Sequence, residues 1–121
     1  MSTGVTISST SSYAILGCGS VGHAVAEELV EQNKDVLIID RDEGRVEALR
    51  DQDLNARSAD IRDEDLPEGI ADRDVVLIMA SDVEANKQAV RNLREENGDD
   101  QFLVARASDP VSADELRDLG A

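Results

Sequence analysis

Three glycines near the start of the chain have the spacing of a phosphate-binding turn. Gly17, Gly19 and Gly22 form a Gly-x-Gly-x-x-Gly pattern, with one apolar run (13–16) before it and another (36–39) after it. In such a turn the first glycine allows a sharp bend, the second lets the backbone approach a pyrophosphate, and the third lets a helix pack closely on a sheet. The pattern predicts a nucleotide site; a tight turn without a ligand is the alternative.

An acid at the end of the second apolar run would complete this site. Asp40 lies close to the spacing of about 20 residues at which a carboxylate accepts hydrogen bonds from ribose hydroxyls. Its charge would repel a 2′-phosphate, so we expect NAD or NADH to bind better than NADP, while ATP, ADP and AMP offer the same ribose. Arg41 argues the other way, because an arginine here can stack on adenine or meet a phosphate.

The residues between the glycines add backbone donors rather than reactive groups. Ser20 and Val21 open the predicted helix, where free amides and the helix dipole favour an anion. Cys18 lies inside the turn and fills a small space, since no neighbouring base would activate it. His23, in the first helical turn, is more typical of a surface residue than of a catalytic one.

Further candidates follow later apolar runs, because open parallel sheets bind ligands beyond the carboxyl ends of their strands. Asp60 and Ile61 could meet the adenine edge, although a solvated loop acid explains Asp60 equally well. Ala80 and Ser81 are expected at the same edge, where Ser81 could instead only cap a helix.

Arg106 is the basic residue expected at this edge after the run 102–105. It could meet a phosphate, hold a neighbouring subunit or domain, or pair with Asp109. The full set of candidate nucleotide-binding residues is Gly17, Cys18, Gly19, Ser20, Val21, Gly22, Asp40, Arg41, Asp60, Ile61, Ala80, Ser81 and Arg106.

Catalytic machinery is missing from the sequence. There is no Walker lysine, no Cys/His cluster for a metal, and no credible acid–base pair of histidine, lysine or tyrosine. We therefore expect this chain to bind a nucleotide without turning it over, and to hold no metal.

The charge balance is unusual. The chain has 27 acidic and 12 basic residues, a net charge of −15, and its only lysines are Lys34 and Lys87. Self-repulsion of this size destabilises a folded domain in dilute buffer, and molar salt screens it. The composition favours a halophilic protein from a salt-rich cytosol over an ordinary acidic protein. It also argues against a nucleic-acid partner, which needs a basic patch.

The remaining composition indicates a cytoplasmic protein. No apolar stretch approaches the length of a membrane span, and the first residues lack the basic and apolar regions of a signal peptide. A single cysteine excludes an internal disulfide and fits a reducing compartment.

Apolar runs alternate with stretches of helical spacing, which predicts an α/β fold. Continuous apolar runs are typical of strands buried on both faces of a parallel sheet. The predicted strands are 13–16, 36–39, 55–59 (the weakest), 75–79 and 102–105, and the predicted helices are 20–33, 42–52, 82–96 and a last one ending at Leu119. This order predicts a Rossmann-like doubly wound parallel sheet of about five strands with helices on both faces.

Local signals refine the ends of these elements. Asp42 is a candidate N-cap, and Ser81-x-x-Glu84 and Ser112-x-x-Glu115 read as capping boxes. Segment 61–73 has no clear period and is expected to be mostly loop.

The domain organisation is one nucleotide-binding domain (13–121) after a flexible leader (1–12). A sheet of this type would add a sixth strand after the last helix, whose C-cap we assign to Gly120. We therefore expect the chain to be a piece of a longer protein.

These motifs resemble the TrkA-N domain, also called RCK (regulator of potassium conductance). The resemblance runs from Tyr13 to the end, through "LGCGSVG", "IIDRDEGRVEAL", the "AD" at 59–60, "VVLIMASDVEAN" and "LVARASDPVSADELRDLGA". Members bind NAD(H) or adenine nucleotides and report them to an attached or partner machine, commonly a potassium channel or transporter at the inner face of the membrane. The resemblance also implies a homodimer.

Similar domains precede DHH-type phosphoesterase domains in archaeal proteins described as exopolyphosphatase-related, and the motifs resemble these fused forms slightly more. Ser20 and His23 stand where potassium-linked members often have a phosphate-binding arginine, and segment 61–73 is shorter than theirs. Both departures weaken the link to transport.

The sequence is compatible with three functions. The first is a regulatory nucleotide-binding module whose output is potassium flux or phosphoester hydrolysis. The second is the cofactor-binding half of an NAD-dependent oxidoreductase, and the third is an interaction domain with an empty site.

Overall fold

The structure is a computed structural model that describes residues 12–17, 19–62, 69–70, 73–97, 102–107 and 109–119. Its elements follow the predicted alternation of strand and helix. They are β1 (Ser12–Leu16), α1 (Ser20–Glu31), β2 (Asp35–Asp40), α2 (Glu43–Asp51), β3 (Ala56–Ser58), β4 (Val75–Ile78), α3 (Val83–Asn97), β5 (Phe102–Ala105) and α4 (Pro110–Leu119).

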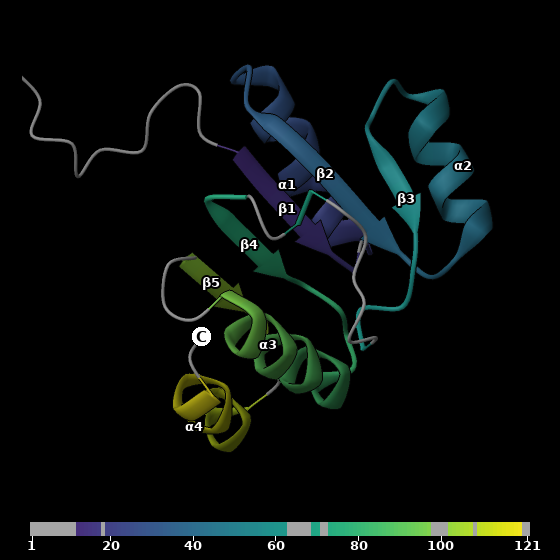
Figure 1. The fold of residues 1–121 in the computed structure, drawn as a ribbon. Coiled ribbons are helices and arrows are strands. Elements are labelled where there is room, and N and C mark those ends of the chain that lie inside the picture. The colour runs from purple at the N-terminus through teal and green to yellow at the C-terminus, as the bar shows by residue number, and fades with distance from the viewer. Residues whose placement is uncertain are drawn as a thin grey trace, which may run out of the picture.

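The five strands form one sheet in the order β3-β2-β1-β4-β5, and every pairing is parallel. The first strand pairs with β2 on one side and with β4 on the other, so the direction of winding reverses between β1 and β4. Figure 1 shows the strands side by side with their arrowheads at one edge. In sheets of this kind a crevice opens beyond the carboxyl ends of the strands at the reversal point. The predicted fold class is confirmed.

Helices cover both faces of the sheet and bury two separate aliphatic cores. In Figure 1, α3 and α4 lie in front of the sheet and α1 lies behind it. The front core joins Leu16, Ile39 and Ile78 from the sheet to residues of α3 and α4, among them Val90. The rear core joins Ile15, Val36 and Ile38 to Ala26 of α1 and to Val46 and Leu49 of α2. Because both faces are covered, the strands are apolar at nearly every position.

Helices α1 and α2 end earlier than predicted, for the same reason. Asn33 (φ 62°) and Asp53 (φ 63°) have left-handed backbones just past the two helices. The N–H that follows each of them bonds back to Leu29 (3.0 Å) and Leu49 (3.1 Å), which closes the helix end. Asparagine and aspartate tolerate this conformation better than most residues, so they mark helix ends without a glycine.

Two of the three predicted caps are wrong. Asp42 does cap α2, accepting the Arg45 N–H at 3.2 Å. Helix α3, however, is capped by Asp82, whose Oδ1 accepts the N–H of Glu84 at 3.0 Å, and not by Ser81. Asp82 is the residue directly before the helix, and its carboxylate also interacts favourably with the positive end of the helix dipole.

Helix α4 begins before its predicted capping box. It starts at Pro110, a residue suited to a first helical position, and the Asp109 carbonyl accepts the Ala113 N–H at 3.0 Å. Ser112 therefore lies inside the helix. Glu115 serves another purpose, because it pairs with Lys87 of α3 at 2.7 Å and joins the two helices.

Some predictions fall on residues outside the described ranges. These are the leader (except Ser12, which opens β1), Gly120, Cys18 and most of the loop 61–73.

Candidate functional site

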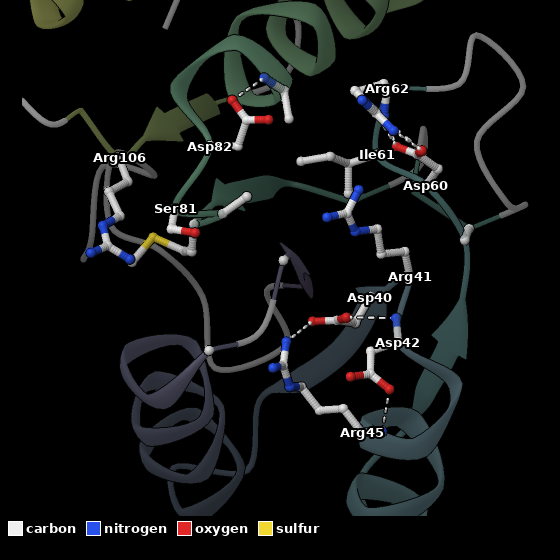
Figure 2. Close-up of a pocket in the computed structure, with 16 residues that line it drawn as sticks. Asp40, Arg41, Asp42, Arg45, Asp60, Ile61, Arg62, Ser81, Asp82 and Arg106 are labelled. Carbon is white, nitrogen blue, oxygen red and sulfur yellow. Dashed lines mark hydrogen bonds and ion pairs between the residues drawn. The ribbon is translucent and has the colours of Figure 1, made fainter.

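A cavity of about 380 Å³ opens at the carboxyl edge of the sheet. It is bordered by the turns after β1, β2, β3, β4 and β5, and Figure 2 shows its side chains. Its volume lies within the range of about 300–1,000 Å³ that is typical of small-molecule sites. It is lined by Gly17, Gly19, Asp40, Arg41, Asp42, Arg45, Ala59, Asp60, Ile61, Arg62, Met79, Ala80, Ser81, Asp82, Ala85 and Arg106.

Most of the candidate residues from the sequence meet at this cavity. Cys18 lies outside the described residues. Ser20, Val21 and Gly22 belong to the first turn of α1, next to the cavity-lining Gly19. Gly22 is buried, as expected of a glycine that lets the helix approach the sheet. Sequence reasoning missed Asp42, Arg45, Ala59, Arg62, Met79, Asp82 and Ala85 as lining residues.

In the glycine turn, the backbone of Gly17 packs directly against the backbone of neighbouring strand ends. Gly17 has a left-handed backbone (φ +84°), and its N–H donates to the Ile39 carbonyl at 2.8 Å. A Cβ at Gly17 would lie 2.8 Å from the backbone nitrogen of Ala80, whereas a Cβ at Gly19 would meet nothing within 4 Å. The first glycine is therefore required by the fold, and the second leaves an open approach to the N-terminus of α1.

Asp40 is buried at the end of β2 and is already held by the protein. It is 5% exposed; its Oδ1 accepts the Asp42 N–H at 2.9 Å, and its Oδ2 accepts Nη1 of Arg45 at 3.0 Å. The arginine compensates the buried charge and fixes the carboxylate. Its two oxygens are thus held at the carboxyl edge of the sheet, where a ligand with hydroxyl groups would approach.

Asp60 is held in a similar way beyond β3. Arg62 forks onto its carboxylate, with Nη2 2.7 Å from Oδ2 and Nε 3.0 Å from Oδ1. The side-chain bonds from Arg62, followed by its backbone N–H and helped by the charges of Arg62 and Arg41, lower the pKa of Asp60 from 3.8 to about 2, against a smaller opposing effect of burial. Asp60 is thus a preformed carboxylate at neutral pH.

The side of the cavity beyond β4 and β5 has a different chemistry. Figure 2 shows Ser81 and Arg106 on this side, with Asp60 and Arg62 on the opposite one. Arg106 is exposed, and its backbone N–H donates to the Ile78 carbonyl at 2.8 Å. The alternative that Arg106 pairs with Asp109 is not seen: among the described residues its guanidinium makes no ion pair.

The charge of the cavity differs from that of the molecule. Its lining carries four aspartates and four arginines, in a chain whose net charge is −15. Arg45 and Arg62 are paired with Asp40 and Asp60. Arg41 and Arg106 line the cavity and have no ion pair with any described residue. Arg41 and Arg106 would therefore offer an anionic ligand two cations beside the glycine turn.

Other chemistry has little support in the described part of the chain. Within those ranges no group of three or more His, Cys, Asp or Glu residues could hold a metal ion. His23 contacts the end of α2 and its own helix, with Nε2 2.8 Å from Oε1 of Gln52 and 3.5 Å from Oε1 of Glu27. None of the helices described is long and apolar enough to cross a membrane.

This doubly wound sheet, with its glycine turn and paired acids, defines a Rossmann-like domain with a ligand cavity at the switch point. The chain belongs to the TrkA-N domain family, whose model matches residues 13–121. The resemblance inferred from the motifs is thus confirmed. A search of curated protein sequences finds no significant match.

Solved structures with the same fold include domains of an exopolyphosphatase-related protein, an inner membrane protein and a channel. The NAD(P)-binding domain of an exopolyphosphatase-related protein from Archaeoglobus fulgidus has a TM-score of 0.77 and 31% identity, over 90% of this chain and 82% of that one. The TrkA-N domain of the inner membrane protein ybaL from Escherichia coli has a TM-score of 0.80 and 19% identity, over 93% and 84%. The GsuK channel bound to NAD has a TM-score of 0.81 and 16% identity, over 93% of this chain but 20% of the channel chain. The last two show a shared fold only.

Proposed function

We propose that this chain is a regulatory domain that binds NAD(H) and reports its occupancy to another domain or protein. The observation that carries the proposal is the buried Asp40, held by Arg45 at 3.0 Å beside an open glycine turn. A fixed carboxylate at the end of β2 suits the ribose hydroxyls of an adenine nucleotide. The relative from A. fulgidus, at 31% identity, is named for an NAD(P)-binding domain.

Each side of the cavity would hold one part of the ligand. The adenosine would lie between Asp40 and Asp60, with Arg41 and Ile61 near the base. The pyrophosphate would lie over Gly19 and the first amides of α1, at Ser20 and Val21. Ser81 and Arg106 would then face the second nucleotide. ATP, ADP or AMP would use the first two parts only.

Asp40 favours the unphosphorylated ribose, and Arg41 bears on the same choice. The carboxylate of Asp40 is buried and fixed, so a 2′-phosphate placed beside it would be repelled. Arg41 is exposed, so its guanidinium could turn toward such a phosphate. Because the fixed, buried group contributes the stronger interaction, we expect NADH to bind better than NADPH.

The output is the response of an attached or partner domain to the bound nucleotide. Nucleotide occupancy would bias a conformation or a dimer interface that an attached or partner domain reads. The relative from A. fulgidus, which belongs to an exopolyphosphatase-related protein, favours a phosphoesterase output, and membership of the TrkA-N family makes potassium transport at the inner face of a membrane the other candidate output. A homodimer fits either setting. The chain itself would catalyse no reaction.

The second candidate is the cofactor half of an oxidoreductase. The same fold occurs in a zinc-dependent alcohol dehydrogenase from Rhodobacter sphaeroides, with a TM-score of 0.62 over 42% of that chain. In that case the acid–base residues would have to come from a separate domain.

A ligand-induced shift in melting temperature tests the proposal. It would compare NAD⁺, NADH, NADPH, ATP and AMP in molar KCl, for the native chain, Asp40→Asn and Asp35→Asn. Asp35 is a matched control, because it is an exposed acid at the opposite end of the same strand, paired with Arg73. Ligand at about 100 times its Kd should stabilise the native chain by roughly 2.7 kcal/mol.

We expect the shift to be largest with NADH, to survive in Asp35→Asn and to vanish in Asp40→Asn. A shift with AMP and ATP alone would make the domain an adenylate sensor. The absence of any shift in cooperatively melting native protein would refute nucleotide binding by this chain.

A further inference from the structure

Asn86 joins the ends of β4 and β5 at the edge of the cavity. The paired residues of these strands end at Ile78 and Ala105, and the Arg106 N–H donates to the Ile78 carbonyl at 2.8 Å. Asn86, in the second turn of α3, donates from Nδ2 to the Ala80 carbonyl at 2.8 Å and to the Arg106 carbonyl at 3.0 Å. One side chain therefore holds two lining residues that come from different strands.

The orientation of this amide is fixed by its partners. Both are carbonyl oxygens, which only the NH₂ group can approach as a donor. The side chain is fully buried, and its Oδ1 has no hydrogen-bond partner among the residues that the structure describes. A buried acceptor without a partner costs stability, so Asn86 is not the residue that would serve the fold best. Such conflicts with stability are typical of functional sites.

Holding the Ala80 carbonyl also orients the next amide. The C=O and N–H of a trans peptide point in opposite directions, so the Ser81 N–H points away from Asn86. Ser81 lines the cavity, and its N–H has no partner among the residues that the structure describes. On the other strand, the bond to the Arg106 carbonyl fixes the backbone from which the unpaired guanidinium extends.

We propose that Asn86 is a positioning residue for the second half of a bound dinucleotide. By fixing the ends of β4 and β5, it presents the Ser81 N–H and the Arg106 guanidinium to the part of the ligand beyond the pyrophosphate. This inference rests on the proposed function and adds to it, since it divides the site into an adenosine side that does not depend on Asn86 and a second side that does.

The same helix offers a matched control on the other side of the cavity. Asn92 is also buried (6% exposed), and its Nδ2 donates to the carbonyl of Arg62 at 3.0 Å, beside Asp60. A variant at Asn92 should disturb the adenosine side, which AMP and NADH share. A variant at Asn86 should disturb only the side that NADH uses and AMP does not.

The experiment is calorimetric titration of NADH and AMP into the native chain, Asn86→Leu and Asn92→Leu in molar KCl. For Asn86→Leu we expect the Kd of NADH to rise about tenfold and that of AMP to change less than about twofold. For Asn92→Leu both constants should rise together. Asn86→Ala replaces Asn86→Leu if the larger side chain prevents folding.

Arg106→Gln tests the link to the guanidinium. It should weaken NADH selectively, and its effect combined with Asn86→Leu should be smaller than the product of the two separate effects, because both act through one contact.

The outcomes separate this inference from the proposed function. A native chain that binds neither ligand refutes the function itself. Binding of AMP without NADH leaves a nucleotide site but overturns the role of Asn86, since no second half is recognised. The role is also overturned if Asn86→Leu changes both constants equally or neither, or if no variant at Asn86 folds.

Discussion

At the scale of single residues, the site pairs each buried or half-buried acid with an arginine that sequence reasoning did not assign to it. Asp40 and Asp60 were predicted because they follow strands whose carboxyl ends must meet at one edge. Arg45 and Arg62 were missed, because their contacts depend on how the chain turns after each strand. The only signal in the sequence was proximity, since Arg45 follows Asp40 by five residues and Arg62 follows Asp60 by two.

The pair of Asp60 and Arg62 predicts a dependence of stability on pH. The pKa of Asp60 is lowered from 3.8 to about 2 in the folded chain, so the unfolded chain binds more protons between these values. The stabilisation is complete above about pH 4 and is lost as the pH falls toward 2. Because Arg62 is half exposed, we expect it to amount to less than about 1 kcal/mol.

Urea unfolding of the native chain and Asp60→Asn at pH 6, 4 and 2.5 measures this effect. The difference between the two should be largest at pH 6 and should shrink below pH 4. Asp51→Asn is a control of opposite sign: Asp51 is exposed, has no ion pair in the described structure and lies in the last turn of α2, so its removal should not destabilise the chain at pH 6. A difference for Asp60→Asn that is independent of pH would contradict the assignment.

At the scale of elements, the apolar runs predicted β1, β2, β4 and β5 to within one residue at each end, because strands covered on both faces are mostly apolar. The edge strand β3 contains the exposed Arg57 and has no apolar run, so its prediction depended on its position between two helices. The ends of helices were predicted less well. Asp82 and Asp109 rather than the two serines precede α3 and α4, since several residues in each loop could cap and the path of the chain from the sheet decides between them.

The turn between β1 and α1 packs closely against the backbone that follows β4, and this contact gives the second prediction. Gly17→Ala would place a Cβ 2.8 Å from the Ala80 nitrogen in a left-handed backbone, so β4 would have to move away from the turn. We expect a loss of at least about 2 kcal/mol in the free energy of unfolding, measured in urea at molar KCl.

Gly19→Ala is the matched comparison in the same turn. Its Cβ would meet no protein atom within 4 Å, so the free energy of unfolding should change by less than about 0.5 kcal/mol. Its methyl group would nevertheless stand where a pyrophosphate approaches, and we expect NADH binding to weaken. Equal stability losses in the two variants would show that the turn does not separate a structural glycine from a ligand-facing one.

At the scale of the whole molecule, the sequence predicted the charge but not its distribution. The cavity lining is balanced, so the excess of 15 negative charges lies on the rest of the chain. Some of it is placed unfavourably: Glu31 and Asp51 lie in the last turns of α1 and α2, at the negative ends of the helix dipoles. The fold therefore carries repulsion that salt should relieve.

This repulsion gives the third prediction. Between 0.1 and 2 M KCl the Debye length falls from about 10 Å to below about 3 Å, so we expect the native chain to gain at least about 2 kcal/mol in stability, seen as a rise in melting temperature. The triple variant Glu31→Gln, Glu47→Gln, Asp51→Asn removes three exposed acids that make no ion pair in the described structure. It should be more stable than the native chain at 0.1 M KCl and should gain less from added salt.

Arg57→Gln provides the opposite change. Arg57 is an exposed cation on the edge strand β3, and removing it adds to the excess of negative charge. Its melting temperature should fall at low salt and should depend on KCl more steeply than that of the native chain. If salt acted mainly by strengthening apolar burial, the native chain and both variants would have parallel salt dependences, since their aliphatic cores are the same. If the three proteins instead differ in how steeply their melting temperatures depend on KCl, in the order of their net charges, repulsion between surface acids is the reason that the stability of this fold depends on salt.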